Sequence, residues 1–83
     1  LQLQVRYFAS LREALGKDRE SVGTSAATAG ALRQALIERG EPYATALAHG
    51  KAVRMAVNQV MAADGQALCD GDEVAFFPPV TGG

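Results

Sequence analysis

The sequence is poor in the residues that small proteins use for covalent or metal-based stabilisation. Its 83 residues include one cysteine, Cys69, one histidine, His49, and no tryptophan. A lone cysteine cannot form an internal disulfide, and with one histidine it cannot complete the ligand set of a structural zinc site. We therefore interpret Cys69 as a structural residue and His49 as an ordinary surface residue. We expect no permanently bound metal or cofactor.

An excess of one charge is also missing. Eight Lys and Arg residues face nine Asp and Glu residues, which gives a net charge of −1. A nucleic-acid-binding protein would show a strongly basic face, so the charge balance argues against that class. No apolar run approaches the roughly 18 residues of a transmembrane helix, and no signal-peptide pattern leads the sequence. We expect a cytoplasmic protein that contacts neither nucleic acid nor membrane.

The composition nevertheless favours folding, since 48% of the residues are hydrophobic. A chain of this length forms one small domain with a radius of gyration of about 12 Å. Such a domain has no room for a deep substrate cleft, and the sequence shows no nucleophile–base pair or phosphate-binding loop. We therefore predict that the protein is not an enzyme on its own and takes part in chemistry with a larger partner.

Periodicity predicts the first elements. Residues 1–7 alternate as a half-buried strand with Leu3, Val5 and Tyr7 facing the core. Ser10 and Glu13 have the spacing of a capping box that opens a short helix, which ends at Gly16. A second strand follows at residues 19–22.

The rest of the chain predicts one main helix and three strands. The main helix begins after Thr28 as N-cap, directs Leu32 and Leu36 to the core, and is followed by Gly40 as a left-handed cap. A shorter helical segment is expected over residues 42–47, and the strands over residues 53–57, 59–62 and 73–77. The fold class is α+β: a mixed sheet packed on one main helix, as in the β-grasp roll, with the first and last strands adjacent at its centre. We place this domain at residues 1–77 and a flexible, extended tail at residues 78–83.

Two aromatic residues break the core pattern of their strands. Phe8 and Phe77 have the parity opposite to the core residues, so they should lie on the sheet face that the helix leaves open. We predict an apolar docking patch formed by both rings, joined by Met61. The competing interpretation is a twist or bulge that turns these rings inward.

Four acidic residues gather near the end of the chain. They are Asp64, Asp70, Asp72 and Glu73. We interpret them as turn-forming and solvating residues, with Asp70 and Asp72 serving one turn. The alternative is an acidic rim that steers docking onto a basic patch of a partner.

The last six residues, Pro78-Pro-Val-Thr-Gly-Gly83, suit the delivery of a carboxylate. The prolines end the last strand and favour a stiff, extended departure from the sheet. Six residues span at most about 20 Å, and this tail has no bulky side chain at its tip. Taken alone, the two glycines also fit a frayed end.

The sequence from Leu68 to Gly83 resembles the end of the small, sulfur-carrying subunits of molybdopterin synthase. Residues 57–59, 7–9 and 11–13 are similar to further segments of these proteins. The resemblance covers nearly the whole chain and implies a ubiquitin-like β-grasp fold. It also implies that an ATP-dependent, ubiquitin-activating-type enzyme adenylates the carboxylate of Gly83, which then becomes a thiocarboxylate.

In this family the tail enters the large subunit, which holds the active site, and gives its sulfur to cyclic pyranopterin monophosphate. The products of two such transfers are the dithiolene sulfurs of molybdopterin. The resemblance implies that Gly83 bears the thiocarboxylate and that Gly82, which has no side chain, keeps the tail narrow. It also implies a heterotetramer with the large subunit. The expected partner interface comprises Phe8, Met61, Phe77, Pro78, Pro79, Val80 and Thr81.

Two alternatives stay open. One is a related sulfur carrier for thiamine thiazole synthesis or tRNA thiolation, and the run of residues 76–80 favours the molybdopterin branch over it. The other is a ubiquitin-like modifier that is joined to lysine side chains and performs no sulfur chemistry.

Overall fold

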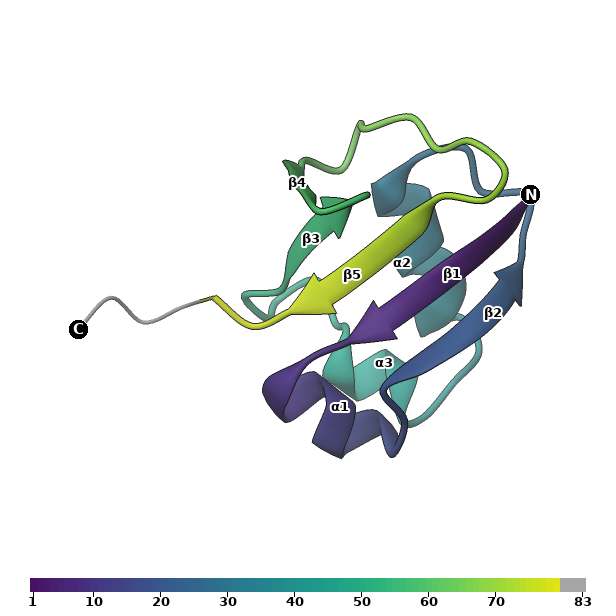
Figure 1. The fold of residues 1–83 in the computed structure, drawn as a ribbon. Helices are drawn as coiled ribbons and strands as arrows, with labels where there is room; N and C mark the ends of the chain where they lie inside the picture. The colour runs from purple at the N-terminus through teal and green to yellow at the C-terminus, as the bar shows by residue number, and fades with distance from the viewer. Residues whose placement is uncertain (80–83) are drawn as a thin grey trace.

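A five-stranded mixed sheet organises the molecule, and the computed structural model describes residues 1–79 of it (Figure 1). Its strands are β1 (Gln2–Tyr7), β2 (Arg19–Gly23), β3 (Arg54–Val57), β4 (Val60–Ala62) and β5 (Glu73–Phe77). The helices are α1 (Ala9–Leu15), α2 (Ala29–Ile37) and α3 (Tyr43–Ala46). The predicted order of elements is confirmed.

The first and last strands are neighbours at the centre of the sheet. The strand order is β2-β1-β5-β3-β4, and β1 and β5 run parallel with Val5 opposite Val74 and Tyr7 opposite Phe76. All other pairs are antiparallel. A parallel pair requires a long crossover connection, and the segment containing α2 supplies it. The predicted mixed sheet and its central pair are therefore confirmed.

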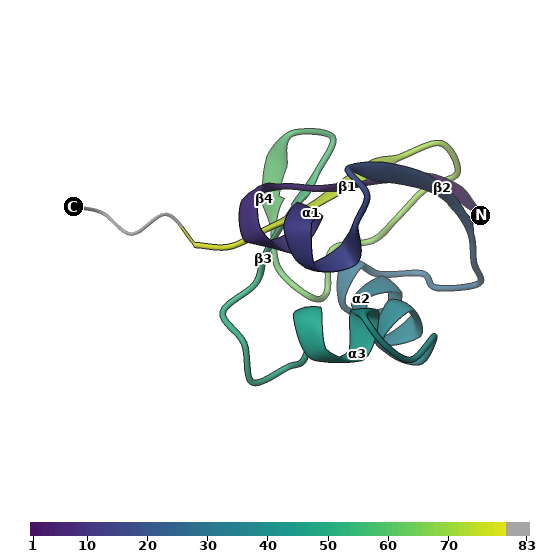
Figure 2. The same cartoon turned by 90° about the horizontal axis from the view of Figure 1, so that it is seen from below.

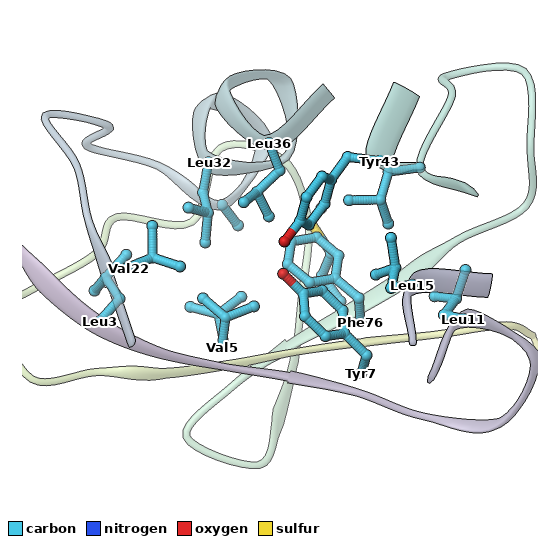
Figure 3. Close-up of a cluster of buried hydrophobic side chains, with 14 of the residues drawn as sticks. Leu3, Val5, Tyr7, Leu11, Leu15, Val22, Leu32, Leu36, Tyr43 and Phe76 are labelled. Atoms are coloured by element: carbon cyan, nitrogen blue, oxygen red, sulfur yellow. The ribbon is translucent and has the colours of Figure 1, made fainter. Parts of the chain in front are cut away.

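Helices α2 and α3 cover one face of the sheet (Figure 2). Leu32 and Leu36 point from α2 into the core, with exposed fractions of 0% and 1%. Beneath them Tyr7 and Phe76 stack with ring centroids 6.1 Å apart (Figure 3). The side chains of β1 and β5 that the alternation predicted to be in the core are therefore buried.

The helix ends follow the predicted caps with one exception. Thr28 Oγ1 accepts a hydrogen bond from the Ala31 N–H at 3.2 Å, and Gly16 is left-handed with φ +72°. The predicted capping box at Ser10 is wrong, because α1 begins at Ala9 and Phe8 occupies the N-cap position. The Phe8 N–H donates to the Phe76 carbonyl at 3.1 Å and the Phe8 carbonyl accepts from the Leu11 N–H at 3.1 Å, so the helix begins two residues earlier than expected.

A polar cluster closes one end of the core around Glu20. Its Oε2 accepts from the hydroxyls of Tyr7 and Tyr43 at 2.8 and 2.7 Å, and Arg39 Nη1 donates to its Oε1 at 3.0 Å. Burial, followed by the bond to Glu20, raises the pKa of Tyr7 far above its ordinary value. Burial also acts to raise the pKa of Glu20, but the bonds from Tyr43, Tyr7 and Arg39 outweigh it and lower that pKa. The cluster ties β1, β2 and α3 together.

Candidate docking site on the open face of the sheet

The open face of the sheet is the surface opposite α2 and α3. Backbone register places one residue from each of four strands in a row across it: Arg6 opposite Ala75, Ala75 opposite Ala56, and Ala56 opposite Met61. Because side chains alternate along a strand, Phe77 lies on this face too. Small alanine side chains at the centre leave the face shallow between larger residues.

A pocket of about 700 Å³ lies on this face. It is lined by Arg6, Phe8, Ala9, Gln59, Glu73, Ala75, Phe77, Pro78 and Pro79. Most of these side chains are apolar, and the charged ones come from the two central strands. A surface of this kind suits an apolar side chain of a partner protein better than a polar metabolite.

Four predicted interface residues meet at this pocket. Phe77, Pro78 and Pro79 line it together with Phe8, which comes from the other end of the sequence. Phe8 has an exposed fraction of 36%, and Phe77 is half-buried. Neither ring belongs to the hydrophobic core, so the inward-turned alternative is wrong. Their role as partner anchors stays a prediction.

Met61 is the predicted interface residue that stands apart. It lies on the edge strand β4 with an exposed fraction of 58%, and it does not line the pocket. Register still places it at the end of the row that contains Ala56 and Ala75. A partner that covers the pocket would need to extend over β3 to reach it.

Two tight turns build the pocket walls. Ala9 adopts φ +52° directly after Phe8, and this left-handed turn redirects the chain from β1 into α1. Asn58 and Gln59 adopt φ +50° and +69° between β3 and β4. The Asn58 side-chain oxygen accepts from the Glu73 N–H at 3.0 Å, while the Asn58 N–H donates to the Glu73 carbonyl at 2.8 Å. These bonds fix Gln59 beside the start of β5.

Sequence reasoning missed Arg6. Its guanidinium carbon lies 4.9 Å from the centroid of the Phe8 ring, which is cation–π distance. Its Nε is buried and has no hydrogen-bond partner among residues 1–79. The alternation of β1 could have indicated it, because Arg6 has the parity opposite to Val5 and Tyr7 and therefore lies on the same open face as Phe77.

The acidic residues near β5 act mainly in turns. Asp70 Oδ1 accepts from the Gln2 N–H at 2.7 Å, and Asp72 Oδ2 accepts from the Cys69 N–H at 2.8 Å. That bond, followed by one from the Asn58 side chain, lowers the pKa of Asp72. The turn interpretation is therefore confirmed for Asp72, whereas the Asp70 side chain joins this turn to the start of β1 and Glu73 also lines the pocket.

The remaining candidate side chains do not form a reaction centre. Cys69 is exposed and its main-chain N–H donates to Asp72, so its thiol is not part of the core and the predicted structural role stays a prediction. His49 is exposed and its Nε2 lies 2.5 Å from Gln34 Oε1, as suits a surface residue. Within residues 1–79 no His, Cys, Asp and Glu side chains gather as metal ligands. No helix in that range is long and apolar enough to cross a bilayer.

Four predicted site residues lie outside the described residues. They are Val80, Thr81, Gly82 and Gly83. The described chain reaches Pro79 at the pocket, two residues beyond the end of β5. The assignment of residues 78–83 as a tail therefore stays a prediction.

Comparison with known proteins places this geometry in a family. The model of the ThiS family matches residues 5–83. The molybdopterin synthase sulfur carrier subunit of Escherichia coli K12 is 46% identical over 81 residues, which cover 98% of this chain and 99% of that protein.

Solved structures agree on the fold. The crystal structure of SAMP1 from Haloferax volcanii is 30% identical and has a TM-score of 0.78, with full coverage of both chains. A chain from the complex of subunits 1 and 2 of molybdopterin-converting factor from Helicobacter pylori 26695 has a TM-score of 0.66 at 24% identity, again over both whole chains. The ubiquitin-like β-grasp fold is confirmed, and this chain belongs to the ThiS family.

Proposed function

We propose that this protein is the sulfur carrier subunit of a molybdopterin synthase. The observation that carries the proposal is the 46% identity to such a subunit over 98% of this chain. The sequence also ends in Gly82-Gly83, the residues to which the resemblance assigns the chemistry. The protein is then a sulfur-donating subunit and not an independent enzyme.

The proposed chemistry takes place at the carboxylate of Gly83. A carboxylate is a poor electrophile, so a ubiquitin-activating-type enzyme first joins it to AMP from ATP and releases pyrophosphate. Hydrosulfide then attacks the acyl carbon and displaces AMP, which leaves a thiocarboxylate. Splitting the exchange of oxygen for sulfur in this way replaces one difficult step by two easier ones. Glycine at this position leaves the acyl carbon open to attack from either side.

The proposed partner binds the open face and takes up the tail. Pro78 and Pro79 line the same pocket as Phe8 and Phe77, so a protein seated there lies next to the start of the last residues. Proline donates no main-chain hydrogen bond, so β5 ends at Phe77 and the following residues are free to leave the sheet. We propose the large subunit of the synthase as this partner, in the cytoplasm, and we propose that sulfur passes there to cyclic pyranopterin monophosphate.

The test follows sulfur by intact mass. After incubation with ATP, the activating enzyme and a sulfur source, the mass should rise by the difference between one sulfur and one oxygen. A chain extended by one residue after Gly83 moves the carboxylate by about 3.5 Å and should not be adenylated. Cys69→Ala is the matched control and should react like the wild type. If the extended, unprocessed protein supports wild-type dithiolene formation and Cys69→Ala does not, Cys69 is the carrier and the proposal is wrong.

Gly82→Val tests whether the activating enzyme and the large subunit both require a narrow tail. It keeps the terminal carboxylate but adds a β-branched side chain, so a tight channel should reject it. Pyrophosphate exchange measures adenylation, and dithiolene formation measures transfer on the large subunit. Unchanged activity in both assays would show that clearance at Gly82 is irrelevant.

A second candidate is a ubiquitin-like protein modifier. The likeness to SAMP1, a protein whose solved structures call it a small archaeal modifier protein, favours it. A modifier would form isopeptide adducts with lysine side chains of other proteins. Adducts that appear without any thiocarboxylate would support this candidate against the first.

A further inference from the structure

The strands of the open face carry more positive than negative charge, although the whole chain has a net charge of −1. Register places Arg19 of β2 opposite Arg6, and Arg54 of β3 opposite Phe77, so all three arginines belong to this face. Glu73 is the one acidic residue that the strands contribute to it within residues 1–79. Both ion pairs of the described residues are made by Glu20, on the core side of β2.

The Arg6–Arg19 pair is unfavourable by itself. Like charges directly opposite each other on neighbouring strands destabilise a sheet. No carboxylate of residues 1–79 lies within ion-pair distance of either side chain. A cross-strand pair of this kind becomes favourable when an anion from outside the chain is placed beside it.

Arg6 is the member of this group that enters the pocket. Its guanidinium lies over the Phe8 ring, and its buried Nε lacks a partner among the described residues. Buried donors are nearly always paired in folded proteins, so an unpaired one beside a pocket marks a place for an acceptor. The planar guanidinium is suited to a carboxylate because it can donate two parallel hydrogen bonds.

The walls of the pocket narrow the choice of occupant. Phe8, Ala75, Phe77 and the two prolines present apolar surface around the one guanidinium. A free anion or a phosphate backbone would pair with Arg6 but leave these walls exposed to water. A protein surface that carries an apolar side chain beside an Asp or Glu residue satisfies both parts of the pocket.

We propose that Arg6 is the charged anchor of the open face and that it pairs with an Asp or Glu carboxylate of the large subunit. The proposal rests on the proposed function, because it takes the large subunit as the occupant. The same carboxylate lies close enough to Arg19 to relieve its repulsion from Arg6. Arg54, beside Phe77, adds to a positive field that speeds the encounter with an acidic partner surface.

The test compares three variants of the full chain for binding to the large subunit by calorimetry and by association kinetics. Arg6→Leu removes the charge but keeps apolar contact with Phe8, and Arg6→Glu reverses the charge. Lys51→Glu is the matched control, because it makes the same change in net charge at an exposed residue outside the pocket. Urea denaturation checks that each variant is folded.

We expect Arg6→Leu to weaken binding by about thirtyfold and Arg6→Glu to weaken it further. The association rate of the wild type should fall as salt rises, and that of Arg6→Leu should fall less steeply. Lys51→Glu should bind like the wild type. If Arg6→Leu binds like the wild type, or Lys51→Glu weakens binding as much as Arg6→Glu, the proposal is wrong.

A wild-type chain that does not bind the large subunit at all would overturn the proposed function and this anchor with it. A wild-type chain that binds, together with unaffected Arg6 variants, would overturn the anchor alone. Should Arg6→Glu fail to fold, Arg6→Leu still decides the question. Binding of a short single-stranded RNA probe that depends on Arg6 as strongly as large-subunit binding would also overturn it.

Discussion

Phe76 and Phe77 are adjacent in β5 but should serve different purposes, and replacing each by alanine tests this. Phe76 has an exposed fraction of 0% and stacks on Tyr7, whereas Phe77 is half-buried and lines the pocket on the open face. Phe76→Ala should therefore remove a large part of the core. Phe77→Ala should leave the core intact and remove a wall of the docking surface.

The expected free energies separate the two variants clearly. Phe76→Ala should lower the free energy of unfolding by about 3–5 kcal/mol, a large part of the roughly 5–15 kcal/mol that a small domain has. Phe77→Ala should lower it by less than about 1.5 kcal/mol, because its ring makes no contribution to the core cluster. Phe77→Ala should, however, weaken the binding free energy for the large subunit by about 2 kcal/mol or more.

Urea denaturation followed by far-UV circular dichroism measures the first quantity, since the sequence has no tryptophan for fluorescence. Calorimetry with the large subunit measures the second. An equal loss of unfolding free energy in the two variants would place Phe77 functionally in the core. An unchanged affinity for Phe77→Ala would show that the pocket is not the docking surface.

Three further changes test the supports of the fold and the pocket. Glu20→Gln should destabilise the fold by about 1–3 kcal/mol at pH 7, because Tyr7 and Tyr43 lose a charged acceptor. The lowered pKa of Glu20 stabilises the fold above about pH 4.3 and is lost as pH falls through its folded value, so urea midpoints of the two proteins should converge in acid. Asn58→Ala should cost about 1–2 kcal/mol in the same assay, and a smaller loss would show that its side-chain bonds to Glu73 and Asp72 are dispensable. Ala9→Gly should change the melting temperature little, whereas Ala9→Val should lower it, because φ +52° strains a β-branched residue; equal melting temperatures would contradict this.

Alternation in the strands predicted much of the fold and both aromatic residues of the candidate site. Side chains of a strand repeat every second residue, so the parity of Phe8 and Phe77 placed both on the open face before any pairing was known. The same rule places Arg6 on the open face. The burial of its Nε, however, results from packing against other residues such as the Phe8 ring. No pattern within one strand carries that information.

Other features depend on competition between distant segments. The spacing of Ser10 and Glu13 is typical of a capping box, but the hydrogen bond from the Phe8 N–H to the Phe76 carbonyl on β5 fixes Phe8 as the last extended residue, and α1 begins directly after it. The cluster at Glu20 joins residues from four segments, and nothing in the sequence near Glu20 indicates Tyr43 as its partner.

The central position of β5 has a consequence for how the domain is made. Its partner β1 is at the other end of the chain, and long-range parallel pairing is slow to form because so much chain must be ordered first. During synthesis β1 and β3 each present an unpaired edge until residues 73–77 leave the ribosome, which invites association between nascent chains. A chain that ends before residue 73 therefore lacks both the central strand β5 and the glycines at 82 and 83, so it has neither a completed sheet nor the group on which the proposed chemistry depends.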